Sequence, residues 1–345
     1  MPACSVSVVI PCYDYGWCLR ECVESVLGQR GVDVRVLIID DASTDDSARV
    51  AEALAATDAR VDVRRHAVNL GHIATYNEGM QWAAGRYTVL LDADDMLTPG
   101  SLERACALLE AHPEVGFVYG AALVFGDGRA RPRPRSGQGR WKVWPGRRWF
   151  EVRCQSTENC IRSPEVVLRT SLLRQVGGYR EELPHAADFE MWMRLALHAD
   201  VGYIAGPHQA YYRDHATGMH RQCFATPLAD LTQVRDAFAI LFCDHGELIA
   251  DRERVETLVN RTLAQRALQA ACRAYDRGQP DPTEVAGLVE LAVATGDAPR
   301  QLRALERRQR LGPYLCRMLR PFRVMSHLRR LRQAVRRRRM WRSGL

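Results

Sequence analysis

The feature that most constrains the fold is a regular alternation of strand-like and helix-like segments through the first hundred residues. Strand patterns, which are short apolar runs rich in β-branched residues, cover residues 6–10, 34–39, 61–63 and 87–91. Helical spacing of apolar residues lies between them, over residues 17–28, 47–56 and 73–84. This alternation predicts an α/β fold with a mostly parallel sheet and helices on both faces.

Polar side chains follow three of these strands. Pro11 and Tyr13 follow the first strand, Asp41 follows the second, and an acidic run at residues 92–95 follows the last. We expect them at the ligand site, because open parallel sheets bind ligands at the carboxyl ends of their strands. The alternative role for Asp41 is the N-cap of the next helix, which Ser43 or Asp45 could supply equally well. No glycine-rich dinucleotide motif follows the first strand, and no phosphate-binding P-loop motif occurs in the chain.

The acidic run is a candidate metal site. Asp92 and Asp94 are two residues apart at the end of an extended segment, so their side chains point the same way, and Asp95 adds a third carboxylate. Like charges this close cost free energy unless a cation offsets them. Carboxylate oxygens are typical ligands of Mg²⁺ or Mn²⁺. The alternative is an acidic turn that caps the helix expected to begin near residues 99–101.

Five segments of the chain resemble, in order, the motifs of the family 2 glycosyltransferases. They are VVIPCY at 8–13, IIDDASTD at 38–45, LLDADD at 90–95, VGGY at 176–179 and ADFEMWMR at 187–194. The resemblance spans about residues 5–220. It implies the nucleotide-diphospho-sugar transferase fold called GT-A, and an enzyme that transfers a sugar from a nucleotide-sugar donor with inversion at the anomeric carbon.

The resemblance also implies roles for the residues at the strand ends. Pro11 and Tyr13 would line the base pocket, and Asp41 would contact the nucleoside, typically uridine. Asp94 would bind a divalent metal, Mn²⁺ or Mg²⁺, that bridges the diphosphate. Asp92 would contact the ribose or the metal.

The segment at 187–194 implies a general base. Asp188 would accept the proton of the acceptor hydroxyl, whose high pKa requires a positioned carboxylate. Its alternative role is to cap the helix expected over residues 188–197. The remaining residues that we expect to contact the acceptor, or to support those that do, are Asp95, Glu190, Trp192 and Arg194.

A histidine further along the chain is a candidate third metal ligand. The segment YYRDH at 211–215 resembles the Y-R-x-H segment of the family, whose histidine approaches the metal or the diphosphate. His215 is therefore predicted at the metal, and its alternative is a structural or solvated role. The chain departs from the family at Tyr76, where many members carry arginine, and at Ala187, where the usual residue is glutamate.

An arginine- and proline-rich stretch at residues 129–135 is predicted to form a hairpin tip or a loop. Trp141, Trp144 and Trp149 follow it. The stretch and the tryptophans are candidates for acceptor contacts, because guanidinium groups bind phosphate or carboxylate and aromatic faces suit sugar rings. The alternative is a solvated tip above buried tryptophans.

The charge of the chain is concentrated at its end. Residues 300–345 contain 16 arginines and one acid, Glu306, and carry +15, so a total of +7 leaves −8 on the preceding residues. Apolar residues recur every three or four positions from Leu315 to Val335, which predicts a basic amphipathic helix. An anionic membrane surface is the partner we favour for it. The alternatives are packing against the body of the protein and binding of nucleic acid or another polyanion.

These patterns predict three parts: a GT-A domain over 1–225, a helical extension over 226–299 and an arginine-rich tail over 300–345. The chain shows no secretory signal and no long uncharged apolar stretch, and its 11 cysteines include no C-x-x-C pair. We therefore expect a cytoplasmic protein with reduced thiols, peripheral on the cytoplasmic face of the membrane.

The function that we predict is transfer of a sugar from a nucleotide sugar, of the UDP type, to a hydroxyl of a glycan or lipid-linked acceptor. One alternative enzyme is a sugar-1-phosphate nucleotidyltransferase, which is disfavoured because its glycine-rich basic N-terminal loop is missing. The alternative outside enzymes is a catalytically silent scaffold that binds nucleotide sugars or anions, against which the intact Asp92, Asp94 and Asp188 argue.

Overall fold

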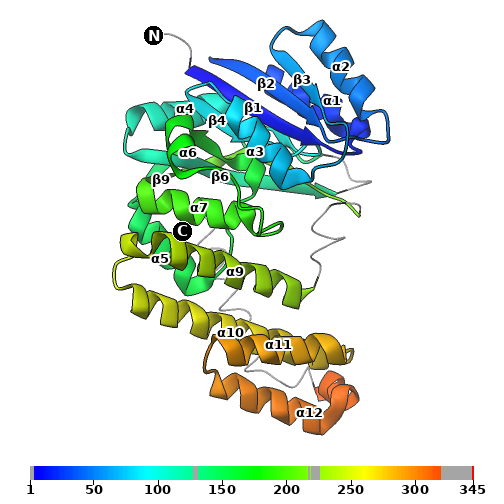
Figure 1. Cartoon of the computed structure of the whole chain (residues 1–345), viewed down its shortest axis with the longest axis vertical. Helices are drawn as coiled ribbons and strands as arrows, with labels where there is room; N and C mark the ends of the chain where they lie inside the picture. Colours follow the sequence, from blue (N-terminus) through cyan, green and yellow to red (C-terminus); the bar gives the residue numbers. More distant parts are fainter. Residues whose placement is uncertain (1–3, 127–130, 217, 219–225, 320–343) are drawn as a thin grey trace. The chain divides into compact units, whose positions relative to one another are not determined.

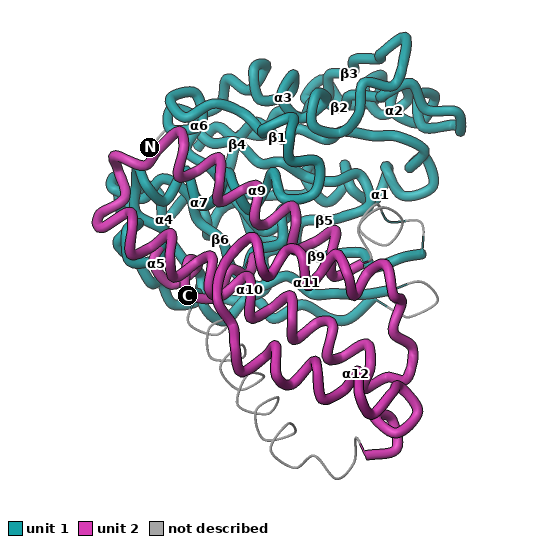
Figure 2. The backbone as a smooth tube through the Cα atoms, turned by 60° about the horizontal axis from the view of Figure 1, so that its bottom comes forward, with its two compact units in different colours: residues 1–150, 160–218, 344 teal, residues 151–159, 219–343, 345 magenta. Residues whose placement is uncertain are grey.

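The computed structural model describes residues 4–126, 131–216, 218, 226–319 and 344–345. The chain divides into two compact units, which Figure 2 colours separately. The first unit comprises residues 1–150, 160–218 and 344, and the second comprises residues 151–159, 219–343 and 345. The three-part division predicted from the sequence stays a prediction, because most of the tail lies outside the described residues.

The first unit is built on one mixed sheet, seen in Figure 1. Its order along the main path is β3-β2-β1-β4-β8-β6-β9-β5, and β7 pairs with β9. The strands are β1 (Cys4–Cys12), β2 (Val32–Asp40), β3 (Val61–Arg65), β4 (Tyr87–Leu90), β5 (Met96–Leu97), β6 (Val115–Gly126), β7 (Arg140–Trp144), β8 (Val167–Arg169) and β9 (Asp200–Asp214).

Most of this sheet is parallel, as the sequence predicts. β1, β2, β3 and β4 run parallel to one another, and β6 and β9 run parallel to each other beyond the antiparallel β8. β1 has β2 on one side and β4 on the other, so the chain changes direction across the sheet at β1. Such a switch point opens a crevice at the carboxyl ends of the strands, which is where ligands of these folds bind.

Helices cover both faces of this sheet. The side chains of Val6, Val8 and Ile10 on β1 belong to a buried core that includes Leu19 and Val23 of α1. Val9 points to the opposite face, as the alternation of a strand requires. There it meets α3 so closely that a Cβ at Gly79 would lie 2.0 Å from Val9 Cγ1. Glycine at this position therefore allows α3 to pack directly on the sheet.

The helices of the first unit are α1 (Gly16–Leu27), α2 (Ser47–Thr57), α3 (His72–Trp82), α4 (Ser101–Ala111), α6 (Thr170–Val176) and α7 (Ala187–His198), with a 3₁₀ turn at Ser163–Glu165. The helices predicted at 17–28, 47–56, 73–84 and 188–197 correspond to α1, α2, α3 and α7 within two residues at each end. α4 begins at the expected residues, whereas α6 was not predicted. A further helix, α5 (Gly146–Ser156), crosses the boundary between the two units.

Of the two alternatives predicted for the stretch after β6, a hairpin tip or a loop, the described residues form a loop. β7 pairs antiparallel with β9 instead of β6. Residues 131–139 form an irregular connection between β6 and β7, and residues 127–130 lie outside the described part.

The second unit is helical, as the sequence predicts for the chain after residue 225. α10 packs against the other three long helices. Their bounds, with the short 3₁₀ turn after the first, are α9 (Pro227–His245), Gly246–Leu248, α10 (Arg252–Arg277), α11 (Pro282–Thr295) and α12 (Pro299–Leu319). In the part of the chain that is described, no helix combines the length and the apolar composition needed to cross a bilayer.

Candidate active site

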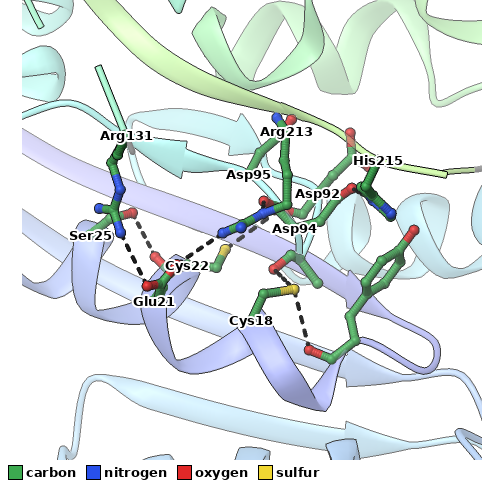
Figure 3. A network of polar contacts seen from close by, with 12 residues as sticks. Cys18, Glu21, Cys22, Ser25, Asp92, Asp94, Asp95, Arg131, Arg213 and His215 are labelled. Atoms are coloured by element: carbon green, nitrogen blue, oxygen red, sulfur yellow. Dashed lines mark hydrogen bonds and ion pairs between the residues drawn. The ribbon is translucent and has the colours of Figure 1, made fainter. Parts of the chain in front are cut away.

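The acidic run lies at the switch point of the sheet, in the loop between β4 and β5 (Figure 3). His215, which directly follows β9, places its Nε2 atom 2.7 Å from Oδ2 of Asp94. The rings of Tyr15 and Trp17 stand edge-on to the imidazole, with centroids at 5.7 and 5.8 Å. The structure therefore brings together the carboxylates and the histidine that the sequence predicts at the metal.

Two carboxylates of this loop, those of Asp92 and Asp95, are buried in surroundings that disfavour their charge. Burial, followed by the charge of Asp94, raises the pKa of Asp92, although a hydrogen bond from Tyr76 acts in the opposite direction. Burial and the same neighbouring carboxylates raise the pKa of Asp95. A bound cation would favour the charged form of these carboxylates.

The donor atoms present fit a divalent cation. Oδ2 of Asp95 is buried and has no hydrogen-bond partner, and the carboxylates of Asp92 and Asp94 provide further oxygen atoms. Among the described residues, no three His, Cys, Asp or Glu side chains converge as a ready-made metal site. None of the three aspartates caps α4, whose N-cap is Gly100 without a side-chain hydrogen bond. The capping alternative raised by the sequence is therefore wrong.

Arg213 connects this loop to α1 (Figure 3). Its backbone N–H donates to Oδ1 of Asp95 at 2.7 Å, and its Nε donates to the carbonyl of Asp94 at 2.8 Å. Its Nη2 donates to Glu21, which also accepts from Arg131 of the arginine-rich stretch. One guanidinium thus fixes the backbone of the acidic loop, and through Glu21 it is linked to the segment around Arg131.

Two thiols of α1 contact the backbone of the same loop. Sγ of Cys22 lies 3.5 Å from the carbonyl of Asp92, and Sγ of Cys18 lies 3.5 Å from the carbonyl of Ala93. Burial raises the pKa of both thiols, so both remain protonated donors. These contacts give the cysteines of α1 a structural role without a disulfide, in keeping with the reduced thiols that the sequence predicts.

Tyr76 occupies the position where many members of the resembled family have arginine. Its hydroxyl donates to Oδ1 of Asp92 at 2.7 Å. Its ring meets the ring of Tyr179 edge-to-face, with centroids 5.4 Å apart. Burial raises the pKa of Tyr179, and the charges of Asp188 and Asp92 raise it further. Tyr76 therefore contacts Asp92, and Tyr179 lies under the influence of both carboxylates.

Asp188 is the second residue of α7 and is half-buried. It does not cap this helix, because the N-cap is Ala186, so the capping role that the sequence left open is wrong. Oδ1 of Asp188 accepts from the backbone N–H of Phe189 at 2.6 Å. Its negative charge also contributes to the raised pKa of Asp92. The residue predicted as the base and the residues predicted at the metal thus share one electrostatic environment.

The VGGY segment is fixed in place by two side chains, the buried Arg194 and the half-buried Asn77. Arg194 donates to the backbone carbonyls of residues 176, 177 and 178, and pairs with Glu190 through two hydrogen bonds of 2.8 and 2.9 Å. Asn77 exchanges two hydrogen bonds with the backbone of Tyr179, at 2.7 and 3.0 Å. This clamp determines where Tyr179 stands relative to Asp92 and Asp188.

Glu190, Trp192 and Arg194 are all fully buried. They therefore fit the supporting role that the sequence left open for them, and they present no surface to an acceptor. Trp192 stacks on Phe117 with centroids 5.9 Å apart, which fixes α7 against β6.

Asp41 is engaged by the loop that precedes α3 and does not cap α2, whose N-cap is Asp46. Its Oδ1 accepts from the backbone N–H of Leu70, and its Oδ2 accepts from that of Gly71, each at 2.8 Å. Nδ1 of His66 lies 2.7 Å from Oδ1 of Asp41, and Nε2 of His66 lies 2.8 Å from Glu78. One lone pair of Oδ2 remains for a ligand at the end of β2.

We predict that His66 stabilises the protein most strongly when it is charged, through its contacts with Asp41 and Glu78. Burial acts to lower its pKa, but hydrogen bonds to Asp41 and Glu78 outweigh it and raise the pKa above 6.5. The stabilisation is therefore complete below the pKa that His66 has in the unfolded chain. It is lost as the pH rises through the higher pKa that His66 has in the folded protein. His66→Phe should cost about 1.5–3 kcal/mol of unfolding free energy at low pH and clearly less at alkaline pH. Urea unfolding at the two pH values measures this, and an equal cost at both would contradict it.

The ends of β1 and β2 form one rigid edge. The backbone N–H of Asp41 donates to the carbonyl of Cys12 at 2.8 Å. Asp14 accepts from the backbone of Thr44 at 2.6 Å. Pro11 lies half-buried within β1, and Tyr13, 44% exposed, follows it with its ring accessible to a ligand. The residues predicted for the base pocket therefore lie along the same edge as the acidic loop.

The three tryptophans do not share one environment. Trp149 is buried and packs edge-on to Phe117, with centroids 5.9 Å apart. Trp144 is half-buried at the end of β7, and Trp141 is exposed. The sequence left open whether the tryptophans are buried or accessible to an acceptor. Trp149 is buried, whereas Trp141 is accessible.

Several residues of the site were not predicted from the sequence. Tyr76 was noted only as a departure from the family, and that departure was itself the signal of a local change. Arg213 was visible as the arginine of the Y-R-x-H segment. His66 and Glu78 carried no motif, and only the fold brings them to Asp41.

The chain is similar in sequence to known proteins. Residues 7–172 match the family described as Glycosyl transferase family 2. An uncharacterized protein of Mycobacterium tuberculosis, MT1568, is 28% identical over 94% of this chain and 92% of its own length. The glycosyltransferase GlyG of Streptococcus pneumoniae is 35% identical over 28% of this chain and 33% of its own length.

Solved structures share the fold. TarS 1–349 of Staphylococcus aureus in complex with UDP-GlcNAc has a TM-score of 0.63 at 15% identity, over 92% of this chain and 90% of that one. The mannosyltransferase PcManGT of Pyrobaculum calidifontis, in complex with GDP-Man and Mn²⁺, has a TM-score of 0.54 at 17% identity, over 91% and 86%. The family match over residues 7–172, the glycosyltransferase relatives and the fold together identify a family 2 glycosyltransferase domain with the GT-A fold in this chain.

Proposed function

We propose that this family 2 glycosyltransferase transfers a sugar from a nucleoside-diphosphate sugar, with UDP as the nucleotide, to a hydroxyl group of a glycan or lipid-linked acceptor, and inverts the anomeric carbon. Asp188 is the general base in this proposal. Asp92, Asp94 and His215 would hold a divalent cation, Mn²⁺ or Mg²⁺, and with it the donor. Pro11, Tyr13 and Asp41 hold the nucleoside.

The observation that carries the proposal is the convergence of two sets of carboxylates at the switch point. Asp92 and Asp94 follow β4, whereas Asp188 comes from α7, almost a hundred residues later. The charge of Asp188 nevertheless acts on Asp92, and Tyr179 lies under the influence of both. Glycosyl transfer to a hydroxyl needs one group to stabilise the departing diphosphate and another to accept a proton, and this arrangement supplies both.

The reaction that fits these residues is a single displacement. The acceptor oxygen forms a bond to the anomeric carbon while the bond from that carbon to the diphosphate oxygen breaks. The proton of the acceptor hydroxyl passes to Asp188, and the leaving group departs as the nucleoside diphosphate. Asp188 suits this role because it is half-buried on a helix that the Glu190–Arg194 pair fixes. A divalent cation bound at the acidic loop would offset the charge that develops on the diphosphate.

The donor class is supported by the residues at the ends of β1 and β2. Tyr13 offers an exposed aromatic ring, and Asp41 keeps one acceptor position for a base or ribose N–H or O–H group. Two proteins of the same fold have been solved with nucleotide sugars, one with UDP-GlcNAc and one with GDP-Man and Mn²⁺. UDP is proposed here because the resemblance at these strand ends implies uridine.

A panel of UDP- and GDP-sugars, each with and without Mn²⁺, tests the proposal by thermal shift and by donor hydrolysis. A ligand at a hundred times its Kd should stabilise the folded protein by about 2.7 kcal/mol, which raises the melting temperature by several degrees. We expect this shift for a UDP-sugar only when Mn²⁺ is present. Asp94→Asn should abolish it, and the matched variant Asp33→Asn, at an exposed position of β2, should not.

Three outcomes of this panel would contradict the proposal. A shift of equal size without Mn²⁺ would remove the cation from donor binding. A shift with GDP-sugars alone would overturn the choice of UDP. Stable binding without any hydrolysis or transfer, for every donor and a range of acceptors, would favour the scaffold alternative.

A further inference from the structure

The last described helix of the second unit, α12, has one side fixed against its own unit. The helix is broken at Gly312, whose φ of 74° is left-handed, and Pro313 starts its final segment. Arg308 forms hydrogen bonds with Asp276 of α10, and Sγ of Cys316 lies 3.5 Å from the carbonyl of Arg308. The buried Cys316 therefore marks the inner side of the final segment.

The opposite side of α12 exposes large apolar side chains. Among the described residues, fourteen large hydrophobic side chains are exposed, and six of them belong to this one helix. Four of the six follow the break, and they are Tyr314, Leu315, Met318 and Leu319. Their spacing places them on one face of the final segment, with Tyr314 73% and Met318 56% exposed. Apolar groups clustered in this way mark an interaction surface.

The same helix carries a strong positive charge. It contains six arginines and a single acid, Glu306. Within the described part of the chain, Arg308 is the only one of the six that pairs with a carboxylate. Arg303, Arg307 and Arg310 are exposed at positions i, i+4 and i+7, so they line one side of the helix before the break. Ten further arginines follow in the sequence after residue 319.

We infer that this surface of α12, formed by Arg303, Arg307 and Arg310 together with the four exposed apolar residues after the break, docks on an anionic phospholipid bilayer. The headgroup region of such a membrane offers negative charge and, directly beneath it, an apolar phase. Arginine and tyrosine bind well at this boundary, and leucine and methionine enter the apolar phase. A nucleic acid would satisfy the arginines and would leave Leu315 and Met318 exposed to water.

Co-sedimentation of the full-length protein with vesicles tests this inference without any measurement of activity. We expect binding to vesicles of phosphatidylglycerol and phosphatidylcholine, weaker binding at high salt, and little binding to phosphatidylcholine alone. The triple variant Arg303→Gln, Arg307→Gln, Arg310→Gln should weaken binding about tenfold or more. The double variant Leu315→Ser, Met318→Ser should weaken it independently, because it removes the apolar contact and keeps the charge.

Each variant has a matched control on an exposed position elsewhere. The charge control is Arg30→Gln, Arg49→Gln, Arg254→Gln, which has the same net charge as the triple variant, and the apolar control is Val293→Ser on α11. Both controls should bind as the wild type does. Equal losses in variants and controls would overturn the inference. A wild-type protein that does not bind the anionic vesicles would also overturn it. The same holds for binding of duplex DNA that needs the three arginines but tolerates the loss of Leu315 and Met318.

Discussion

Asp188→Asn should reduce sugar transfer by about 10²- to 10⁴-fold and leave donor binding intact. Asparagine has nearly the same shape as aspartate, but it does not accept a proton at neutral pH, so the acceptor hydroxyl would lose its base. The residue sits at the second position of α7, half-buried, and is not the N-cap of the helix, so the change should leave the fold unaltered. The Mn²⁺-dependent thermal shift with the UDP-sugar should therefore match that of the wild type.

The measurement is a comparison of kcat and of donor affinity in the same preparations. The matched control is Glu182→Gln, which removes an exposed carboxylate in the turn that precedes α7 and should leave kcat unchanged. A kcat near the wild-type value for Asp188→Asn would show that another group accepts the proton. A loss of donor binding of the same size as the loss of kcat would place Asp188 in the donor site instead.

The parts of the fold that were predictable from the sequence are those with a local pattern. The predicted helix at 17–28 corresponds to Gly16–Leu27, and the predicted strand at 87–91 corresponds to Tyr87–Leu90. Both segments are short. The spacing of their apolar residues depends on whether one face or two faces of the segment are buried. The position of the acidic run at the end of a strand follows from the same pattern, because a buried strand must end before three charged residues.

The long strand β9 was not predicted, because its sequence contains residues that weaken a strand. Gly206 has a φ of 118°, and Pro207 lacks a backbone N–H group. The register with β6 shifts at this point, from Tyr119 opposite Tyr203 to Ala121 opposite His208. The irregularity accommodates both residues, and the strand continues to Asp214. The pairing with β6, β7 and β5, which no local pattern encodes, makes this segment a strand.

The contacts that complete the site were unpredictable for a related reason. Arg213 meets Asp94 and Asp95 across more than a hundred residues, and His66 meets Asp41 across 25. A motif locates the individual carboxylates, but the partners that orient them come from other elements of the fold. Tyr76 shows how a chain that departs from its family can supply a different partner, here a hydroxyl that donates to Asp92.

Glu190→Ala should lower the unfolding free energy of the protein by about 3–5 kcal/mol, the largest stability effect that we expect of a single substitution. Both members of the Glu190–Arg194 pair are buried, with side-chain exposures of 0% and 2%. The change leaves the guanidinium of Arg194 buried without its counter-charge, and this is far more costly than the loss of an exposed pair. The three carbonyls that Arg194 binds would also lose their alignment.

A second pair with the same i, i+4 spacing provides the matched control. Arg20 and Glu24 of α1 lie 3.8 Å apart, and more than half of each side chain is exposed. Glu24→Ala should therefore cost no more than about 0.5 kcal/mol in the same urea unfolding experiment. Similar costs for the two variants would mean that the burial of Glu190 contributes nothing. Because Arg194 also fixes the turn that carries Tyr179, Glu190→Ala should in addition weaken donor binding at temperatures where the variant is still folded, and Glu24→Ala should not.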